Sequence, residues 1–178
     1  MSKPKRILIL GPESTGKSTL AEDLANHFEE PWVPEYAREY LEHLGRAYVY
    51  EDLVKIGKGQ VALEDKTANK AEEYLFCDTD LRVIQIWSEH RFGKTDPWVL
   101  DQIKQRKYDV ILLTDTDLPW TPDPQREYPE LEMRNYFLDL YKKLAEQSGF
   151  PFYLISGNKK RRKDTAIQVI NSLDKEAL

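Results

Sequence analysis

The sequence predicts an α/β fold: a doubly wound, parallel sheet of five strands with helices on both faces and a short lid. Two observations predict this fold class. Five short apolar runs alternate along the chain with longer segments whose apolar residues recur at helical spacing. The 178 residues, 40% of them hydrophobic, supply one substantial core but not two, so residues 1–178 are expected to form a single domain.

Each element of the first half follows from a local pattern. Residues 6–10 are an apolar run too short for a buried helix and closed by a Gly-Pro pair, which predicts a central strand buried on both faces. Apolar residues then recur every four positions from Ser18, as in a helix packed on a sheet. Prolines bracket a short strand at 31–34, and the charged, proline-free stretches 36–44 and 50–73 predict two helices.

The second half continues the alternation of strand and helix. Its predicted strands are short apolar runs with polar ends, and its predicted helices show apolar residues at helical spacing. Strands are expected at 74–78, 109–113 and 152–155, and helices at 81–91, 131–148 and 166–173. No period of 20–50 residues appears, which excludes a repeat architecture.

Composition excludes several classes of protein. Asp and Glu outnumber Lys and Arg by 31 to 26, and the net charge of −5 repels nucleic acids and anionic membranes. The longest apolar runs are far shorter than the ~20 residues of a membrane span or the h-region of a secretory signal. We therefore expect a cytoplasmic protein with no nucleic-acid or membrane partner. The single Cys77 excludes an internal disulfide and a Cys-based zinc site. A homo-oligomer is left open.

Residues 11–18, GPESTGKS, match G-x-x-x-x-G-K-[ST] at every fixed position, between a predicted strand and a predicted helix. In this motif the backbone N–H groups surround the β-phosphate of a nucleotide, and the helix dipole adds to the attraction. Lys17 would bridge the β- and γ-phosphates, and the Ser18 hydroxyl would bind Mg²⁺. Glu13 is unusual in a phosphate cradle, because a carboxylate repels phosphate; it is expected to face the acceptor site or a basic neighbour, or else solvent. The predicted nucleotide-binding residues here are Gly11, Glu13, Ser14, Thr15, Gly16, Lys17, Ser18 and Thr19.

A phosphate loop occurs in kinases, GTPases and motors, so other segments must discriminate. A GTPase needs a guanine-reading Asn-Lys-x-Asp after its fourth strand, where this chain has Thr-Asp-Thr-Asp at 114–117. A ring-forming motor needs a larger module and a separate lid domain. These observations favour a small-molecule kinase that uses ATP and Mg²⁺. A regulatory ATP-binding module that transfers phosphate to nothing small is the alternative outside that class.

The predicted lid, at about 119–134, contains four of the ten prolines. Such a stiff loop can close over the transferred phosphate and exclude water, with Arg126 stabilising its charge. An ordinary surface connection is the alternative. Arg134 is a second candidate for the charge-stabilising role.

Carboxylates follow the predicted strands that neighbour the phosphate loop. Asp78 is predicted to bind Mg²⁺. Asp115 is the alternative, but it follows the fourth predicted strand, which must lead on into the lid, and Asp78 is therefore preferred. Glu35 would lie across the cleft from the γ-phosphate, where a carboxylate can orient an acceptor hydroxyl and take its proton. Each carboxylate alone is more often a helix cap. Their joint position at strand ends favours a site.

Four segments, GPESTGKSTL, PEYAREYL, FCDTDL with the following IW, and DLPWTPDPQRE, resemble the ribosylnicotinamide kinase module of the NadR-type family over nearly the whole chain. The resemblance implies transfer of the ATP γ-phosphate to the 5′-hydroxyl of nicotinamide riboside, which makes nicotinamide mononucleotide in NAD biosynthesis. A kinase for another nucleoside or nucleotide is the alternative within the class. Only five residues precede the first predicted strand, so we expect a standalone kinase without the family's adenylyltransferase and DNA-binding domains.

The same resemblance extends the predicted site. It places Glu35, Tyr36 and Arg38 at the acceptor, and it gives Asp78 and Asp80 to the metal or the ribose. Trp120 corresponds to a lid aromatic that would stack on the nicotinamide ring or else close the lid against the protein. The catalytic set is Lys17, Glu35 and Arg126; the acceptor-binding set is Glu35, Tyr36, Arg38, Asp80 and Trp120; the metal-binding set is Ser18 and Asp78.

The chain's only basic run, KKRRK at 159–163, has no interleaved aromatic residues, and contact with nucleic acid is disfavoured. A solvated helix start, or a position of Arg161 or Arg162 near ATP, fits it better. Asn158 follows the last strand, where related kinases hold the adenine, and it completes the predicted nucleotide-binding set. The three histidines share no ligand spacing and are expected to be structural or exposed.

Overall fold

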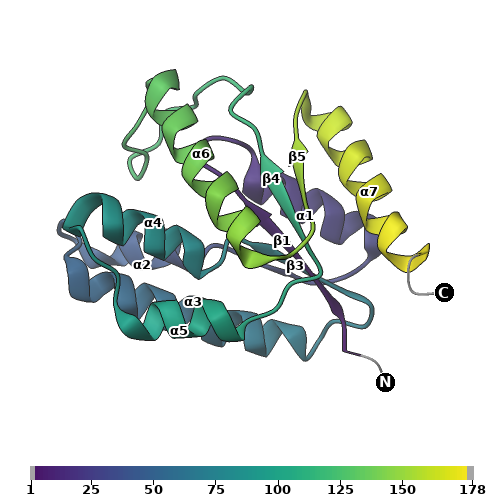
Figure 1. The fold of residues 1–178 in the computed structure, drawn as a ribbon, viewed down its shortest axis with the longest axis horizontal. Helices are drawn as coiled ribbons and strands as arrows, with labels where there is room; N and C mark the ends of the chain where they lie inside the picture. The colour runs from purple at the N-terminus through teal and green to yellow at the C-terminus, as the bar shows by residue number, and fades with distance from the viewer. Residues whose placement is uncertain (1–2, 176–178) are drawn as a thin grey trace.

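The computed structural model describes residues 3–175 and contains a five-stranded, all-parallel sheet between two layers of helices (Figure 1). The ends of the predicted domain, 1–2 and 176–178, lie outside the described residues. In chain order the elements are β1 (Lys5–Leu10), α1 (Lys17–Phe28), β2 (Trp32–Val33), α2 (Tyr36–Leu44), α3 (Tyr50–Ala68), β3 (Tyr74–Asp78), α4 (Leu81–Phe92), α5 (Pro97–Gln105), β4 (Val110–Thr114), α6 (Leu131–Ser148), β5 (Phe152–Ile155) and α7 (Lys159–Lys175).

The strand order is β2-β3-β1-β4-β5, which places β1 at the centre. Ile7 pairs with Phe76 of β3 on one side and with Val110 of β4 on the other. The chain therefore winds away from β1 first in one direction and then in the other. In such a sheet the crevice for ligands lies at the carboxyl end of the strands, where the strand order reverses. The predicted doubly wound fold is confirmed.

Alternation along β1 divides the core between the two faces of the sheet, because successive strand residues point to opposite sides. Ile7 and Ile9 pack with the buried faces of α1 and α7. Leu8 and Leu10 pack on the other face with apolar side chains of α4 and α6. All four side chains are fully buried. This burial on both faces explains why the strand reads as a continuous apolar run.

Helices α2 to α5 lie together beside the sheet (Figure 1) around a third apolar cluster that includes Leu53, Ile56 and Val99. The sequence prediction missed α5, although its start carries a recognisable signal. The Asp96 carboxylate accepts the Trp98 N–H at 2.9 Å, and Pro97 occupies the first turn.

Helix α3 ends at Ala68, so the predicted helix over 50–73 was too long. The physical reason lies in Glu30, which follows α1. Its carboxylate accepts the backbone N–H groups of Glu72, Glu73 and Tyr74. These bonds hold the chain extended as it enters β3, and they take up N–H groups that a continued helix would need for itself.

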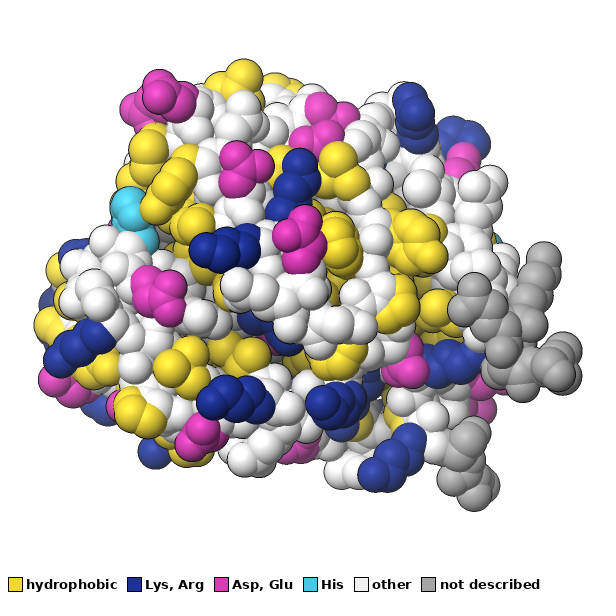
Figure 2. Space-filling view, in the orientation of Figure 1, with side chains coloured by type: hydrophobic (Ala, Val, Ile, Leu, Met, Phe, Trp, Pro, Cys, Tyr) yellow, Lys and Arg dark blue, Asp and Glu magenta, His cyan; other side chains and the backbone are white. Residues whose placement is uncertain are grey.

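The lid predicted at 119–134 contains no strand or α-helix over 119–130, and its last four residues form the first turn of α6. None of the helices within residues 3–175 is long and apolar enough to cross a membrane. On the face shown in Figure 2, Lys and Arg side chains are interspersed with Asp and Glu.

Candidate active site

The phosphate loop connects the end of β1 to the start of α1, and two glycines shape it. A Cβ on Gly11, whose φ is +149°, would lie 2.4 Å from Thr114 Oγ1, so only glycine allows β4 this close. Gly16, at φ +76°, precedes the first residue of α1. Inside the turn, the Thr15 hydroxyl donates to the Pro12 carbonyl at 2.7 Å. Close packing at Gly11, positive φ at Gly16 and this internal hydrogen bond therefore shape the loop.

The two side chains predicted to meet phosphate and metal lie at the start of α1. Lys17 Nζ donates to the Pro12 carbonyl at 2.7 Å, and the Ser18 hydroxyl donates to Asp78 at the end of β3. Asp78 is fully buried, and its Oδ1 has no hydrogen-bond partner. Burial, and next the charge of Glu35, raise the pKa of Asp78 to about 6.

These oxygens fit a magnesium ion, because Mg²⁺ takes hard oxygen ligands and commonly uses one or two carboxylates together with substrate phosphates. No group of three or more His, Cys, Asp and Glu side chains that could hold a metal occurs among residues 3–175. The rival carboxylate is engaged elsewhere: Asp115 accepts the Ser156 hydroxyl at 2.9 Å and the Thr116 N–H at 2.7 Å. The geometry favours Asp78 over Asp115 for the metal.

A cavity opens between the phosphate loop, α2, α4, the lid and α6. It brings together most of the predicted site residues, which come from three separate segments of the chain: the phosphate loop, the start of α2 and the predicted lid. The predicted residues that line it are Gly11, Glu13, Ser14, Thr15, Gly16, Lys17, Ser18, Thr19, Glu35, Arg38 and Arg126, and Arg134 lines it as well.

Three residues assigned to the acceptor by resemblance, Tyr36, Asp80 and Trp120, do not line this cavity. Asp80 caps α4 by accepting the Arg82 N–H at 3.0 Å, and it forms a buried ion pair with the Arg82 guanidinium. Trp120 lies against Arg134, whose guanidinium carbon is 5.8 Å from the ring centroid. The Asp80 and Trp120 side chains therefore make contacts within the protein, and their roles at the acceptor stay predictions.

The predicted metal ligand Asp78, behind Ser18, also lies outside the cavity lining, as do Tyr36 and Asn158. Tyr36 begins α2, where its N–H donates to Gln60 Oε1 at 2.8 Å and its ring packs near Tyr40. The Asn158 side chain accepts the Arg161 N–H at 3.0 Å, so it caps the start of α7. Asn158 therefore has a structural partner that the sequence prediction did not include.

Glu13 is half-buried in the cavity lining, where its carboxylate accepts the Glu127 backbone N–H at 3.0 Å. Burial raises the pKa of Glu13, while the bonds from the lid backbone and the charge of Lys17 oppose that rise. Its neighbour Ser14 accepts the Thr121 N–H at 2.9 Å through its hydroxyl. The acidic third residue of the loop thus ties the lid to the phosphate site.

The lid is also held from the opposite rim of the cavity. Arg38 of α2 forms an ion pair with Asp123 at 3.0 Å, and Gln125 donates to the Arg38 carbonyl at 3.0 Å. Arg91 of α4 lies 3.6 Å from the Glu127 carboxylate. The lid consequently spans the cavity, with polar contacts on both sides.

A second part of the cavity lining, which we call the aromatic end, consists of aromatic side chains from α4, Tyr48 and the lid, and the sequence analysis did not identify it. Tyr48 and Trp87 stack at a centroid distance of 6.4 Å, and the Arg91 guanidinium lies 4.2 Å from the Tyr48 ring centroid. His90 Nε2 is 3.0 Å from the Tyr128 hydroxyl of the lid. The spacing of residues 83, 87, 90 and 91 along α4 was the available signal, because these positions share one helical face.

The parallel sheet and the loop at the end of β1 define the chain as a P-loop NTPase. A family model described as an AAA domain (AAA_28) matches residues 6–162, and the chain belongs to this family. The trifunctional NAD biosynthesis/regulator protein NadR of Escherichia coli K12 is 32% identical over 152 residues, which are 83% of this chain and 37% of NadR. This similarity confirms the resemblance to NadR-type proteins. The chain spans little more than a third of the length of that relative.

Two solved structures of NadR proteins share the fold. One, in complex with NAD and AMP-PNP, matches 96% of this chain and 50% of its own at a TM-score of 0.79 and 24% identity. The other, in complex with NR, matches 96% of this chain and 51% of its own at a TM-score of 0.78 and 21% identity.

Proposed function

We propose that the chain is a kinase that transfers the γ-phosphate of ATP to the 5′-hydroxyl of nicotinamide riboside, with Mg²⁺. One observation carries the proposal: a single cavity joins the phosphate loop, a carboxylate at the start of α2 and an aromatic end. A phosphate donor and a flat heterocyclic acceptor fit its two ends. The similarity to NadR, and the AMP-PNP and NR bound in NadR structures, support this choice of donor and acceptor.

The residues of the phosphate loop would bind and orient the donor. Its backbone N–H groups and Lys17 would surround the β- and γ-phosphates, while Ser18 and Asp78 would hold the metal. Bound Mg²⁺ would neutralise charge on the phosphate oxygens. The Lys17 ammonium donates to the Pro12 carbonyl, and on nucleotide binding it would exchange this neutral oxygen for a charged phosphate oxygen.

The transfer step needs one proton acceptor. As the 5′-oxygen of the riboside bonds to the γ-phosphorus, the bond from that phosphorus to the departing ADP oxygen breaks. The hydroxyl proton would pass to Glu35, which lines the cavity at the start of α2. Arg126 of the lid lines the same cavity and would stabilise charge on the phosphoryl group.

The aromatic end would receive the nicotinamide ring. Tyr48, Trp87 and Tyr128 line this part of the cavity, and aromatic faces attract a cationic heterocycle such as the pyridinium of the riboside. This assignment replaces Trp120, which lies against Arg134. The contacts from the lid to Glu13 and Arg38 would keep water from the transferred phosphate, which favours transfer over hydrolysis.

An acceptor panel tests the proposal. The purified chain is incubated with Mg·ATP and, separately, with nicotinamide riboside, other nucleosides and nucleotides, while ADP formation and acceptor consumption are both measured. We expect equal amounts of ADP and nicotinamide mononucleotide with the riboside. If the chain phosphorylates another member of the panel in preference to nicotinamide riboside, that compound replaces the riboside as the proposed acceptor. ATP hydrolysis without consumption of any acceptor would refute the kinase and favour a regulatory ATP-binding module.

A further inference from the structure

Arg162, near the start of α7, is the buried member of an otherwise mostly exposed basic run. Only 3% of its surface is exposed, whereas Lys159, Lys160 and Arg161 are exposed. A buried guanidinium is costly unless its donors are satisfied. The contacts that satisfy these donors explain why the run contains an arginine at position 162.

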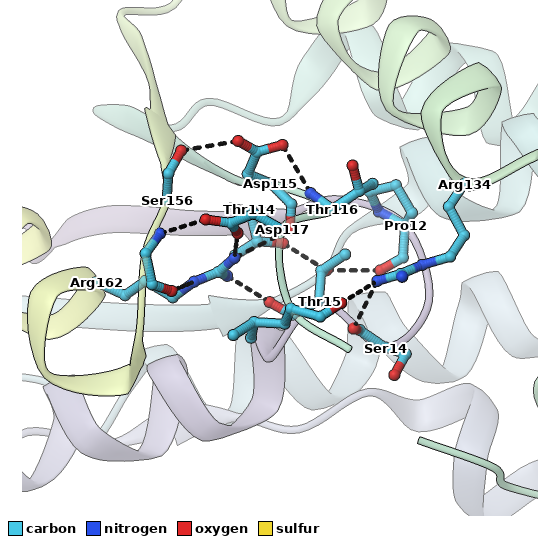
Figure 3. A network of polar contacts seen from close by, with 12 residues as sticks. Pro12, Ser14, Thr15, Thr114, Asp115, Thr116, Asp117, Arg134, Ser156 and Arg162 are labelled. Atoms are coloured by element: carbon cyan, nitrogen blue, oxygen red, sulfur yellow. Dashed lines mark hydrogen bonds and ion pairs between the residues drawn. The ribbon is translucent and has the colours of Figure 1, made fainter. Parts of the chain in front are cut away.

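The Arg162 guanidinium joins three loops that follow three different strands (Figure 3). Its Nη1 donates to the Thr15 carbonyl of the phosphate loop at 2.6 Å. Its Nη2 donates to the Asp115 carbonyl after β4 at 3.0 Å, and its Nε donates to the Gly157 carbonyl after β5 at 2.7 Å. All three guanidinium nitrogens are thus used on backbone oxygens at the carboxyl edge of the sheet.

The positive charge of this group is balanced locally. Arg162 forms an ion pair with the Asp117 carboxylate, which also accepts the Gly157 N–H at 2.5 Å. The Asp117 carboxylate offsets much of the positive field that Arg162 exerts on a phosphate. Arg162 therefore contributes to phosphate binding more by positioning backbone groups than by its charge. A guanidinium suits such a task, because its donors form a rigid planar fork that an ammonium lacks.

The bond to Thr15 fixes the orientation of one peptide group. In a trans peptide the carbonyl of one residue and the N–H of the next point in opposite directions. With the Thr15 carbonyl held on Arg162, the Gly16 N–H points away from Arg162. Gly16 lines the cavity, whereas Arg162 does not. The orientation therefore leaves the Gly16 N–H available to an anion in the loop.

We propose that Arg162 is a positioning residue for the triphosphate: it holds the Thr15–Gly16 peptide in its anion-binding orientation and fixes the loop after β5 relative to the phosphate loop. The proposal rests on the nucleotide-binding role proposed above. It gives the basic run a role inside the protein, carried by one buried side chain.

Calorimetric titration with Mg·tripolyphosphate, which lacks a base and a sugar, tests this proposal separately from catalysis. We expect Arg162→Gln to weaken tripolyphosphate binding roughly tenfold or more, the range for loss of a charged hydrogen bond. Arg162→Lys keeps the charge but not the fork, so it should recover only part of the loss. Lys160→Gln removes the same charge from an exposed position of the same helix, and it should bind within about twofold of the parent.

Kinetics give a second readout that a general loss of folding would not produce. In the folded Arg162→Lys variant, the KM for ATP should rise while the KM for the acceptor stays unchanged. Thermal melting identifies the folded variants, and if Arg162→Gln does not fold, Arg162→Lys carries the test. Parent-like tripolyphosphate affinity in a folded Arg162 variant would overturn the proposal. A parent chain that binds no tripolyphosphate would instead refute the nucleotide-binding function itself.

Discussion

Replacing Asp78 by Asn should make the ligand-free protein more stable while it abolishes magnesium-dependent turnover. The Asp78 carboxylate is fully buried, one of its oxygens has no partner, and Glu35 repels its charge. If the Asp78 carboxylate serves a ligand at the expense of stability, its replacement raises the free energy of unfolding but lowers turnover. A carboxylate with a purely structural role would lose stability on the same substitution.

The magnitude follows from the pKa of Asp78. A rise from 3.8 to about 6 corresponds to roughly 3 kcal/mol, at about 1.4 kcal/mol per pKa unit. Because the folded pKa is the higher one, the folded state binds more protons between these values, and stability falls as pH rises from about 4 to about 6. An asparagine at 78 avoids the buried charge but leaves a buried amide group short of a partner, so we expect a gain of about 1–3 kcal/mol at neutral pH.

Thermal and urea unfolding in EDTA at pH 5 and pH 7.5 measure this effect. The Asn variant should melt several degrees higher than the parent at pH 7.5, at roughly 2–4 °C per kcal/mol for a chain of this size, and the difference should shrink at pH 5. Asp115→Asn tests the rival carboxylate, and it should retain magnesium-dependent turnover. An Asp78→Asn variant that is less stable than the parent at pH 7.5 would refute the reasoning.

Four other substitutions test separate parts of the site. Lys17→Ala should lower kcat at least about 100-fold because it removes the cation at the transferred phosphate; turnover within a few-fold of the parent would exclude that role. Glu35→Gln should lower kcat far more than it raises the KM for ATP, and a defect confined to ATP binding would remove Glu35 from the acceptor site. Trp87→Ala should raise the KM for nicotinamide riboside roughly tenfold, the scale of a lost aromatic contact, with the KM for ATP unchanged; an equal rise in both would contradict an acceptor role. Glu13→Ala removes the acceptor for the lid N–H and should raise the ratio of ATP hydrolysis to phosphate transfer. Glu13→Gln keeps an acceptor oxygen and should leave that ratio unchanged. An unchanged ratio in the Ala variant would exclude the lid contact as a water barrier.

The sheet and the phosphate loop could be predicted because their signals are local. The last four residues of β1, 7–10, are buried on both faces of the sheet and are therefore all apolar. Gly11 and Gly16 occur where the backbone needs positive φ. Helix α5 carried a local signal too, the Asp-Pro start at 96–97, but its apolar residues were not recognised as helical.

The contacts that complete the site are distant in sequence, and so they were not predicted. Glu13 meets the backbone of a residue 114 positions away, and Arg162 meets Thr15 across 147 positions. No local pattern reports such pairs. Trp87 was part of a recognised segment, yet only the packing of α4 against the lid and α6 shows which of its faces lines the cavity.

Transfer of labelled phosphate is the most direct measurement of the proposed activity. The purified chain is given Mg²⁺, ATP labelled at the γ-phosphate and nicotinamide riboside, and the products are separated and identified by mass. We predict that the label appears on the 5′-oxygen as nicotinamide mononucleotide, in amounts equal to the ADP formed, and that Lys17→Ala loses this product. Label released only as inorganic phosphate, with the riboside unchanged, would contradict a riboside kinase.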